Sequence, residues 1–524
     1  MKAYQDASLA PVRRAKALLE EMTLAEKIGQ LNQRLYGFRI YERKCVNGED
    51  TIELSEEFCQ EVEKYSGLGV LYGLYRADPW ADKNYETGLT GVLSKKAYNQ
   101  VQRYVLEHSR LGIPVMMSSE CPHGHQALDG YLLPVNLLAG ATFDPAMVRA
   151  AYRVSGRQLQ NMGVDLALMS MLDVLRDPRW GRSEECYSED PYLSARMAEA
   201  AVIGMQESGP EVVAKHFAAQ GEGTGGVNAS AARIGERELR EIHFPPAAAA
   251  IKAGAKGIMA AYNEIDGVYC HANRWLLNDV IRKEMGFDGI VMSDGVAIDQ
   301  LDSMTGDNVV SGALALQSGV DVGLWDEAFG KLEEAVRRGL VKEAQIDQAV
   351  LRVLTLKFER GLFEHPYLEE EGEIHMDYAQ NPESVQLARE GLVILQNKNQ
   401  GLPFWENQAS GKKIAVVGPN ADDLYNQLGD YTPPLRRDDG ITVLDGMKLI
   451  FKESDIRFSQ GCYLRKRDEN LLKEAVDTVK NSDIVICVLG GSSSRFGGAS
   501  FDTNGAVLLD NAAADDLSLI HISE

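Results

Sequence analysis

Several polar side chains stand at the ends of short apolar runs, where a buried strand would present them to solvent. Asp294 closes the run GIVMSD and Glu120 closes GIPVMMSSE, while Lys215 and His216 lie near the end of EVVAKHF. A carboxylate in such a position can act as a nucleophile or a base, and a neighbouring lysine can bind a hydroxyl group or a carboxylate. These four residues are therefore candidates for an active site.

Two of these candidates also have a structural interpretation. An aspartate at the end of a strand often caps the next helix, here GVAIDQL, so Asp294 is equally a candidate N-cap. His216 is equally a candidate for a hydrogen-bonded histidine of the core. Because neighbouring side chains of a strand point to opposite faces, Lys215 and His216 can both serve a site only near the strand end. The residue pattern leaves these alternatives open.

The segment DPRWGRSEECYSEDP (177–191) is dense in charged residues and contains Arg182. Planar guanidinium groups beside carboxylates suit a polar pocket with fixed hydrogen bonds, and a solvated loop is the alternative. His123 and His125 follow Glu120, but no further ligand has a recognisable spacing, so we predict no metal site.

The segment GEGTGG (221–226) matches a glycine pattern of nucleotide-binding loops, which would indicate a nicotinamide-dependent oxidoreductase. It follows a predicted strand, but the next helical pattern begins only near Glu236. A phosphate cradle needs its glycines at a helix N-terminus, so a loop is the better interpretation. We therefore predict no cofactor.

The apolar runs alternate with segments of helical periodicity at residues 147–163, 193–209 and 329–361. Polar strand ends recur roughly every 30–50 residues, which is the repeat of a strand with its crossover helix. This alternation predicts an α/β protein with a (β/α)8 TIM-like barrel, in which reactive side chains lie at the C-terminal ends of the strands.

A second, incomplete α/β sandwich domain is predicted after the barrel. We place a TIM-barrel-like catalytic domain at residues 1–360, an acidic linker at 361–383 and the partial sandwich domain at 384–515. The second unit should begin with a helix over 383–399 and contain the strands KKIAVVGPN and NSDIVICVLGG. Residues 516–524 are expected to be a non-native tail, because LSLIHISE resembles a translated sequencing adapter; a divergent natural C-terminus is the alternative.

Composition excludes several classes of protein. The formal net charge of −23 disfavours nucleic acids and anionic membranes as partners. The seven cysteines are scattered without a CxxC pair, which argues against a disulfide framework or a zinc site. The N-terminal segment lacks the apolar region of a signal peptide, so we expect a cytoplasmic location. The oligomeric state is not predicted.

Five segments together resemble glycoside hydrolase family 3, the retaining β-glucosidases and β-xylosidases. DPRWGR, KHF, AYNEIDG, GFDGIVMSD and RFGGASFDTNGA occur in the order found in that family. The resemblance implies a small carbohydrate substrate and Asp294 as the catalytic nucleophile. The residues that it implies for sugar binding are Glu120, Arg182, Lys215, His216, Met259 and Tyr262.

The chain also departs from the family pattern. Gly295 stands where relatives often have an aromatic residue after the nucleophile, and Val227 stands where some have an arginine. KHFAAQGEG replaces the KHFPGHG of the N-acetylglucosaminidase branch, which disfavours that activity. The family's acid/base glutamate is expected soon after RFGGASFDTNGA, but from residue 481 onward the one glutamate is Glu524. The acid/base is therefore expected to be absent from this chain, which would be C-terminally truncated.

The expected function is a retaining β-glycosidase that releases terminal non-reducing β-D-glucosyl residues from short oligosaccharides or aryl and alkyl glycosides, through a covalent glycosyl-aspartate. A β-xylosidase is the alternative within the family. Glu120 reaches about 1.5 Å further than an aspartate and would crowd the hydroxymethyl group of glucose. A catalytically incomplete carbohydrate-binding fragment is the alternative from another class.

Overall fold

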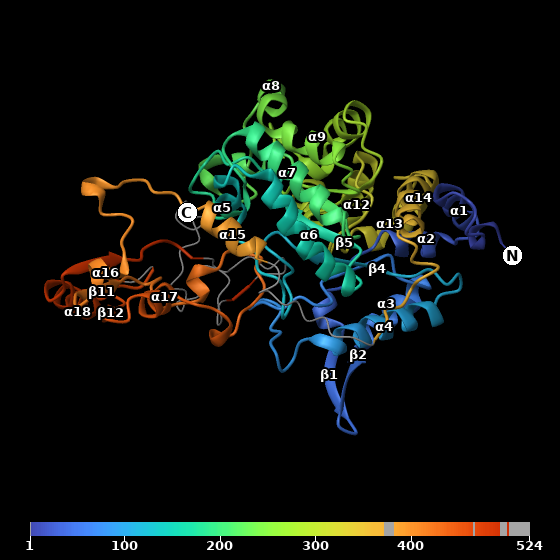
Figure 1. The fold of residues 1–524 in the computed structure, drawn as a ribbon. Coiled ribbons are helices and arrows are strands. Elements are labelled where there is room, and N and C mark those ends of the chain that lie inside the picture. Colours follow the sequence, from blue (N-terminus) through green and yellow to red (C-terminus); the bar gives the residue numbers. More distant parts are fainter. Residues whose placement is uncertain (1, 371–381, 465–466, 493–499, 502–524) are drawn as a thin grey trace.

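The computed structural model describes residues 2–370, 382–464, 467–492 and 500–501. An N-terminal α/β body, blue to yellow in Figure 1, is followed by a smaller C-terminal part in orange and red that lies to one side of it. Among the described helices, none combines the length and the apolar character needed to span a membrane.

The N-terminal body is built on a parallel sheet of six strands in chain order. They are β3 (Val70–Tyr72), β4 (Met116–Glu120), β5 (Leu166–Ser170), β6 (Glu211–Phe217), β7 (Gly257–Ala260) and β10 (Ile290–Met292). Almost every residue of these strands is buried, as the short continuous apolar runs predict. Because all six strands are parallel, their C-terminal ends meet at the same edge of the sheet.

The two outer strands are connected through segments that are not regular strands. Segment 31–36 forms one parallel bridge to β3, and segment 320–325 forms one to β10. Two backbone N–H groups of segment 320–325 donate to carbonyl oxygens of segment 31–36. The predicted α/β class and parallel sheet are confirmed, but the described sheet has six regular strands and not the eight of the predicted (β/α)8 barrel, because the segments 31–36 and 320–325 make only single bridges to it.

Helices surround this sheet (Figure 1). The principal ones are α1 (Pro11–Leu19), α2 (Leu24–Gln30), α3 (Glu56–Tyr65), α4 (Gly91–Glu107), α6 (Pro145–Asn161), α7 (Pro191–Gln206), α9 (Phe244–Lys252), α12 (Asn308–Ser318), α13 (Leu332–Arg337) and α14 (Glu343–Glu359). Asp144 and Asp190 cap α6 and α7, and each precedes a proline at the first helical position. The predicted helices at 147–163 and 193–209 are thus confirmed. The segment 329–361 forms two helices instead of one, separated near Gly339, which has a positive φ.

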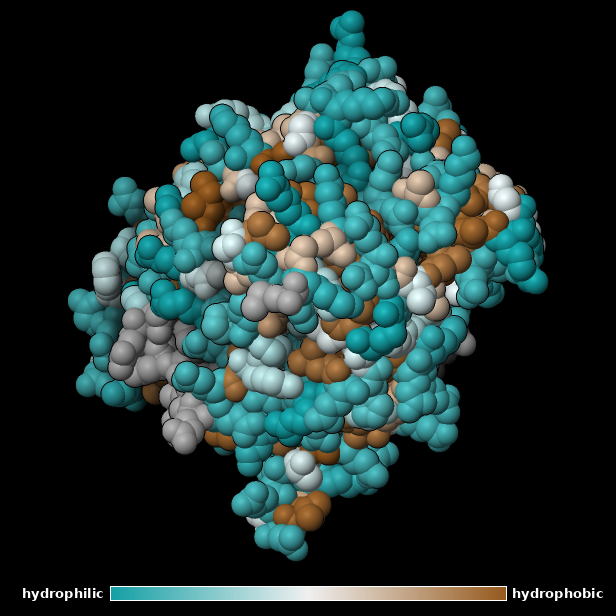
Figure 2. Space-filling model, turned by 90° about the vertical axis from the view of Figure 1, so that its right-hand side faces the viewer, coloured by the Kyte–Doolittle hydropathy of each residue, from teal (hydrophilic) through white to brown (hydrophobic). Residues whose placement is uncertain are grey.

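Two short antiparallel hairpins extend the N-terminal body. They consist of β1 (Tyr41–Val46) with β2 (Glu49–Leu54), and of β8 (Glu264–Ile265) with β9 (Val268–Tyr269). The face drawn in Figure 2 is mostly hydrophilic, with hydrophobic residues in small scattered groups. This surface agrees with a protein whose large apolar side chains are gathered in an interior core.

The C-terminal part contains a second parallel sheet, in the order β12 (Asp455–Ser459), β11 (Lys413–Val417) and β13 (Ile484–Cys487). Helices α17 (Val443–Ile450) and α18 (Glu469–Lys480) accompany it. Ile414, Val416 and Leu444 form its small core, so the predicted α/β character and the two predicted strands are confirmed. The segment expected to be a non-native tail, 516–524, lies outside the described residues.

The helix predicted over 383–399 is wrong in its second half. Helix α15 (Glu383–Glu390) ends before Gly391, and the next four residues, Leu392–Leu395, are 63–93% exposed. The α-carbon of Gly391 lies so close to Leu138 that a side chain there would collide with it. The close contact with Leu138 therefore requires a glycine at the residue where the helix ends, and the helical periodicity of the sequence did not show this end.

Candidate active site

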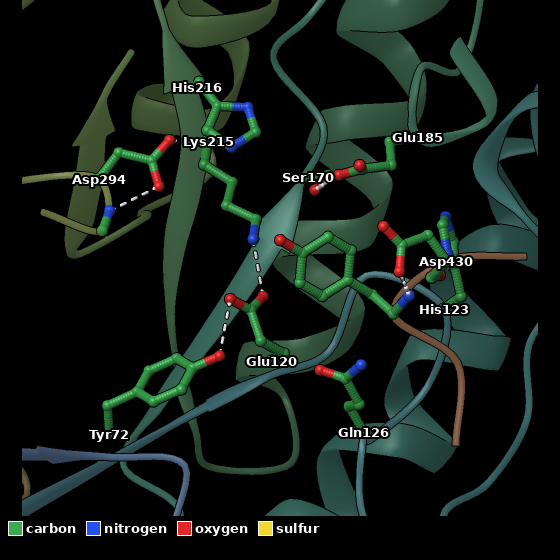
Figure 3. Close-up of polar contacts among 12 residues, drawn as sticks. Tyr72, Glu120, His123, Gln126, Ser170, Glu185, Lys215, His216, Asp294 and Asp430 are labelled. Carbon is green, nitrogen blue, oxygen red and sulfur yellow. Dashed lines mark hydrogen bonds and ion pairs between the residues drawn. The ribbon is translucent and has the colours of Figure 1, made fainter. Parts of the chain in front are cut away.

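The predicted site residues meet at the C-terminal edge of the six-stranded sheet. Glu120 ends β4, Lys215 and His216 lie near the end of β6, and Asp294 follows β10. Figure 3 shows their side chains near one another, with Glu185 and Ser170 on the far side of Lys215. Chain order and parallel strands thus bring together residues from distant parts of the sequence.

Asp294 has one bound and one free carboxylate oxygen. Its Oδ1 accepts a 2.8 Å hydrogen bond from the N–H of Gly295, and its own N–H donates to Nε2 of His271 over 3.1 Å. Its Oδ2 accepts no hydrogen bond from the described residues and lies 3.6 Å from Nε2 of His216. The side chain does not cap helix α10 (Ala297–Gln300), so the N-cap hypothesis for Asp294 is wrong.

His216 joins the site to a buried carboxylate behind it. Its Nδ1 lies 2.7 Å from Oδ2 of Asp173, which only accepts when ionised, so Nδ1 carries the proton and donates. Its Nε2 then has a lone pair that accepts from Nη2 of Arg182 over 3.1 Å. His216 is buried, as the core interpretation requires, but its ring also contacts the candidate nucleophile.

Arg182 lies in a polar pocket and not in a solvated loop. Its guanidinium donates two hydrogen bonds, of 2.6 and 2.9 Å, to the carboxylate of Glu185, which also accepts from the hydroxyl of Ser170. Burial opposes the ionisation of Glu185, but Arg182 outweighs it and holds the pKa of this carboxyl well below its usual value. Arg182 and Glu185 are therefore a charged pair at neutral pH.

Lys215 and Glu120 form a second buried ion pair, with 2.7 Å between Nζ and Oε2. The Tyr72 hydroxyl donates to Oε1 of Glu120 over 3.3 Å (Figure 3). Burial alone would lower the pKa of Lys215, but Glu120 and other nearby anionic groups raise it, so the lysine stays charged. The register between β6 and β7 shifts at Lys215–His216, and such irregularities re-aim side chains at strand ends.

The two remaining predicted residues lie on β7 and just after it. The Tyr262 hydroxyl donates to the carbonyl oxygen of Gly295 over 2.7 Å, so it contacts the backbone beside the candidate nucleophile. Met259 pairs in register with Met292 of β10 and is buried in the main hydrophobic cluster. A contact of Met259 with sugar stays a prediction.

The C-terminal part contributes a residue that the sequence analysis missed. The ring centroid of Tyr431 lies 4.5 Å from Nζ of Lys215, a cation–π distance. The preceding residue, Asp430, anchors this loop: its N–H donates to Glu184 over 2.5 Å and its carbonyl oxygen lies 2.6 Å from Nδ1 of His123. A cavity lined by Tyr431 and residues of both parts adjoins the site on this side. No local pattern marked this loop.

The ring of Trp325 packs against Gly295, the residue after Asp294. A Cβ at Gly295 would lie 2.4 Å from the Trp325 ring and 3.2 Å from the Tyr262 hydroxyl. We therefore expect Gly295→Ala to lower the free energy of unfolding by about 1–3 kcal/mol, the usual cost of overpacking. Chemical denaturation measures this change. Trp325→Leu in the same background should restore part of the loss; a Gly295→Ala variant as stable as the parent would contradict the close fit.

His271 holds the backbone of the candidate nucleophile only while its Nε2 is unprotonated. Burial lowers its pKa from 6.5 to about 4, so between these values the unfolded chain takes up a proton that the folded chain does not. The free energy of unfolding should therefore fall with falling pH in this window, by about 1.4 kcal/mol per pH unit from this group. Chemical denaturation of His271→Gln between pH 4.5 and 6 should give a free energy of unfolding that depends less steeply on pH than that of the parent, by roughly that amount. The exposed His108→Gln variant is the control, and parallel slopes for His271→Gln and the parent would refute the assignment.

The glycine-rich segment 221–226 does not form a nucleotide cradle. It consists of two short 3-10 turns, η4 (Gln220–Glu222) and η5 (Thr224–Gly226), and the next helix, α8 (Glu236–Glu238), begins well after it. A side chain at Gly226 would collide with Arg179 and the backbone of Trp180, so this glycine packs against the segment that carries Arg182. The loop interpretation is confirmed.

Comparison with known proteins agrees with this geometry. Residues 23–356 match the glycosyl hydrolase family 3 N terminal domain, and residues 392–517 match the glycosyl hydrolase family 3 C-terminal domain. A putative beta-xylosidase from Formosa agariphila is 32% identical over 509 residues, covering 94% of this chain and 63% of that protein. A periplasmic beta-glucosidase from Salmonella typhimurium is 30% identical over 529 residues, covering 93% of this chain and 63% of that protein.

Solved structures show the same fold. A β-glucosidase from Erythrobacter marinus superimposes with a TM-score of 0.82 at 30% identity, over 96% of this chain and 68% of that one. The β-glucosidase from Listeria innocua in complex with glucose gives a TM-score of 0.78 at 28% identity, over 92% and 64%. The chain thus spans slightly less than two thirds of the length of the two curated relatives.

Proposed function

The chain belongs to glycosyl hydrolase family 3, and we propose that it is a retaining β-glycosidase acting on terminal β-D-glucosyl residues of short glycosides. The observation that carries this proposal is the carboxylate of Asp294, whose Oδ2 is free and lies 3.6 Å from His216 within a pocket of hydrogen-bonding side chains. A nucleophilic carboxylate beside a site that binds hydroxyl groups is the central requirement of a retaining glycosidase.

The proposed reaction has two steps. Oδ2 of Asp294 attacks the anomeric carbon, a C–O ester bond forms, and the bond to the leaving oxygen breaks while that oxygen takes up a proton. Water then hydrolyses the ester and releases the sugar. Arg182, His216, Lys215 and Glu120 offer donors and acceptors to the sugar hydroxyl groups, which would fix the anomeric carbon against Asp294.

Three carboxyl groups near Asp294 are held in ion pairs, which disfavours them as the proton donor of the first step. Glu120 is bound to Lys215, Asp173 to His216, and Glu185 to Arg182. The segment after which the sequence predicts the acid/base, and the residues beyond it, lie largely outside the described ranges. Rates on aryl glycosides with leaving groups of graded acidity measure how much proton donation the protein supplies, because a good leaving group needs little of it.

Glu120 favours a β-xylosidase as the second candidate. Its carboxylate is held between Lys215 at 2.7 Å and Tyr72 at 3.3 Å. One additional methylene compared with aspartate brings the carboxylate closer to the position of a hydroxymethyl group, which xylose lacks. Curated relatives include both a putative beta-xylosidase and a beta-glucosidase. Under this alternative, Glu120→Asp should shift the ratio of kcat/KM values towards the glucoside.

A covalent trap tests the proposal directly. Incubation with 2,4-dinitrophenyl 2-deoxy-2-fluoro-β-glucoside, and separately with the corresponding xyloside, should add one sugar to Asp294, which peptide mass spectrometry can locate. This reagent carries a good leaving group and therefore does not depend on the proton donor. A label on another side chain would refute the role of Asp294, and sugar binding without any label would favour the incomplete carbohydrate-binding fragment.

A further inference from the structure

Asp326, which follows Trp325 in the chain, is a buried carboxyl group with four hydrogen-bond donors. Burial and the neighbouring Asp299 raise its pKa to about 8, and the hydrogen bonds that it accepts oppose this rise. Its Oδ1 accepts from the backbone N–H groups of Ile298 at 2.9 Å and Asp299 at 3.2 Å. Its Oδ2 accepts from the Ser293 hydroxyl at 2.6 Å and from the N–H of Leu324 at 3.1 Å. The residue is 1% exposed.

Three of these bonds hold both ends of the loop that carries the candidate nucleophile, and the fourth, from Leu324, stays within the segment that contains Asp326. Ser293 immediately precedes Asp294, while Ile298 and Asp299 lie in the first turn of α10. Further bonds join the same two segments: the N–H of Ser293 donates to Val322 and that of Val296 donates to Leu324, each over 2.8 Å. The loop 293–299 is therefore fixed to the segment 322–326 along its whole length.

The same geometry explains why Asp294 is free. The first N–H groups of a helix need acceptors, and a polar side chain at the N-cap, directly before the helix, usually supplies one. The N-cap of α10 is Val296, which has no side-chain acceptor, and Asp294 lies two residues before it. Oδ1 of Asp326 accepts the two N–H groups of α10. Because Asp326 satisfies the helix, Oδ2 of Asp294 keeps its lone pairs for another partner.

We propose that Asp326 is a positioning residue for Asp294: by capping α10 and binding Ser293, it holds the nucleophile loop so that the Asp294 carboxylate stays free to attack. This inference rests on the proposed function. Asp299 returns the interaction, since its carboxylate accepts from the N–H groups of Glu327 and Ala328, each at 2.9 Å. Two reciprocal carboxylates thus clamp the two segments together.

The test compares the rate of covalent trapping with sugar affinity in the full chain. In Asp326→Asn, an NH2 group replaces one carboxylate oxygen. This NH2 group then faces at least one of the N–H or O–H groups that donate to Asp326 in the parent protein. We expect the rate constant for inactivation by the fluoroglycoside to fall roughly 100-fold, the scale of a misplaced reacting group. The dissociation constant for glucose, or for xylose if the xyloside is the faster trap, should stay within about threefold, because the residues proposed to bind sugar are elsewhere.

Ser293→Ala provides a second variant should Asp326→Asn fail to fold. It removes one of the four donors, and we expect it to slow trapping roughly tenfold with unchanged sugar affinity. Glu327→Gln is the matched control, because its exposed side chain neighbours Asp326 but binds Arg34 instead of the loop.

The outcomes separate this inference from the proposed function. Parental trapping rates in Asp326→Asn and Ser293→Ala would overturn the positioning role while leaving the nucleophile assignment intact. A parallel loss of sugar affinity and trapping rate would also overturn it, since that pattern indicates a general structural role. A parent protein that is not labelled at Asp294 would overturn the proposed function itself.

Discussion

Replacing Asp294 with asparagine is expected to abolish trapping by the fluoroglycoside and to reduce turnover of an activated aryl glycoside at least about 1,000-fold, or about 4 kcal/mol of activation free energy. The physical reason is that an amide oxygen lacks the charge needed to form the ester with the anomeric carbon. The amide can still accept the bond from the N–H of Gly295, which the Oδ1 of Asp294 accepts over 2.8 Å. The fold should therefore survive, and sugar binding should change little.

The measurement needs one precaution and one control. An asparagine before Gly295 deamidates readily and would restore aspartate, so the mass of the variant must be checked and Asp294→Ala assayed beside it. Asp288→Asn, on the exposed loop before β10, is the matched control and should behave like the parent. Substantial turnover by Asp294→Ala would remove Asp294 from the mechanism.

Replacing Lys215 with methionine is expected to have the second largest effect, because it leaves Glu120 as an unpaired charge in the interior. Both residues are nearly inaccessible, at 2% and 5% exposure. Breaking a buried ion pair from one side typically costs about 3–5 kcal/mol of stability. Sugar affinity should fall as well, since the pocket loses a charged donor. Chemical denaturation and sugar titration measure the two effects.

The double variant Lys215→Met with Glu120→Gln tests whether the loss of stability comes from the broken ion pair or from the loss of either side chain by itself. Removing both charges should restore much of the stability lost in Lys215→Met, because no unpaired charge remains buried. It should not restore sugar affinity. If the double variant is as unstable as the sum of the two single variants, the ion pair is not the cause of the loss.

Much of the fold and several site residues could be predicted from local patterns. An apolar run that ends in a polar residue indicates a buried strand and its exposed end, so the ends of β4, β6 and β10 were predictable, together with Glu120, Lys215, His216 and Asp294. The same reasoning failed at Leu392–Leu395, because hydrophobic periodicity records the residue types and not the residue at which the helix ends.

Contacts between distant segments could not be predicted. Whether Asp294 caps α10 depends on which carboxylate reaches the start of this helix, and only the packing of segment 322–326 on the loop 293–299 makes it Asp326. Likewise, the residues next to Gly295 in the sequence give it no aromatic partner, but the ring of Trp325 packs against it in the folded chain. Tyr431 enters from the C-terminal part, and nothing near it in the sequence indicates that it meets Lys215.

The amino-acid sequence by itself determined the parallel α/β class, the strand ends that carry polar residues, and the resemblance to a family. These follow from residue types and spacings within a few neighbouring positions, where backbone geometry is local. Only the tertiary structure decided which side chains pair, which oxygen of Asp294 is free, and which distant residues complete the pocket. Those choices depend on burial and on hydrogen bonds between segments far apart in the chain, and local spacing carries no information about them.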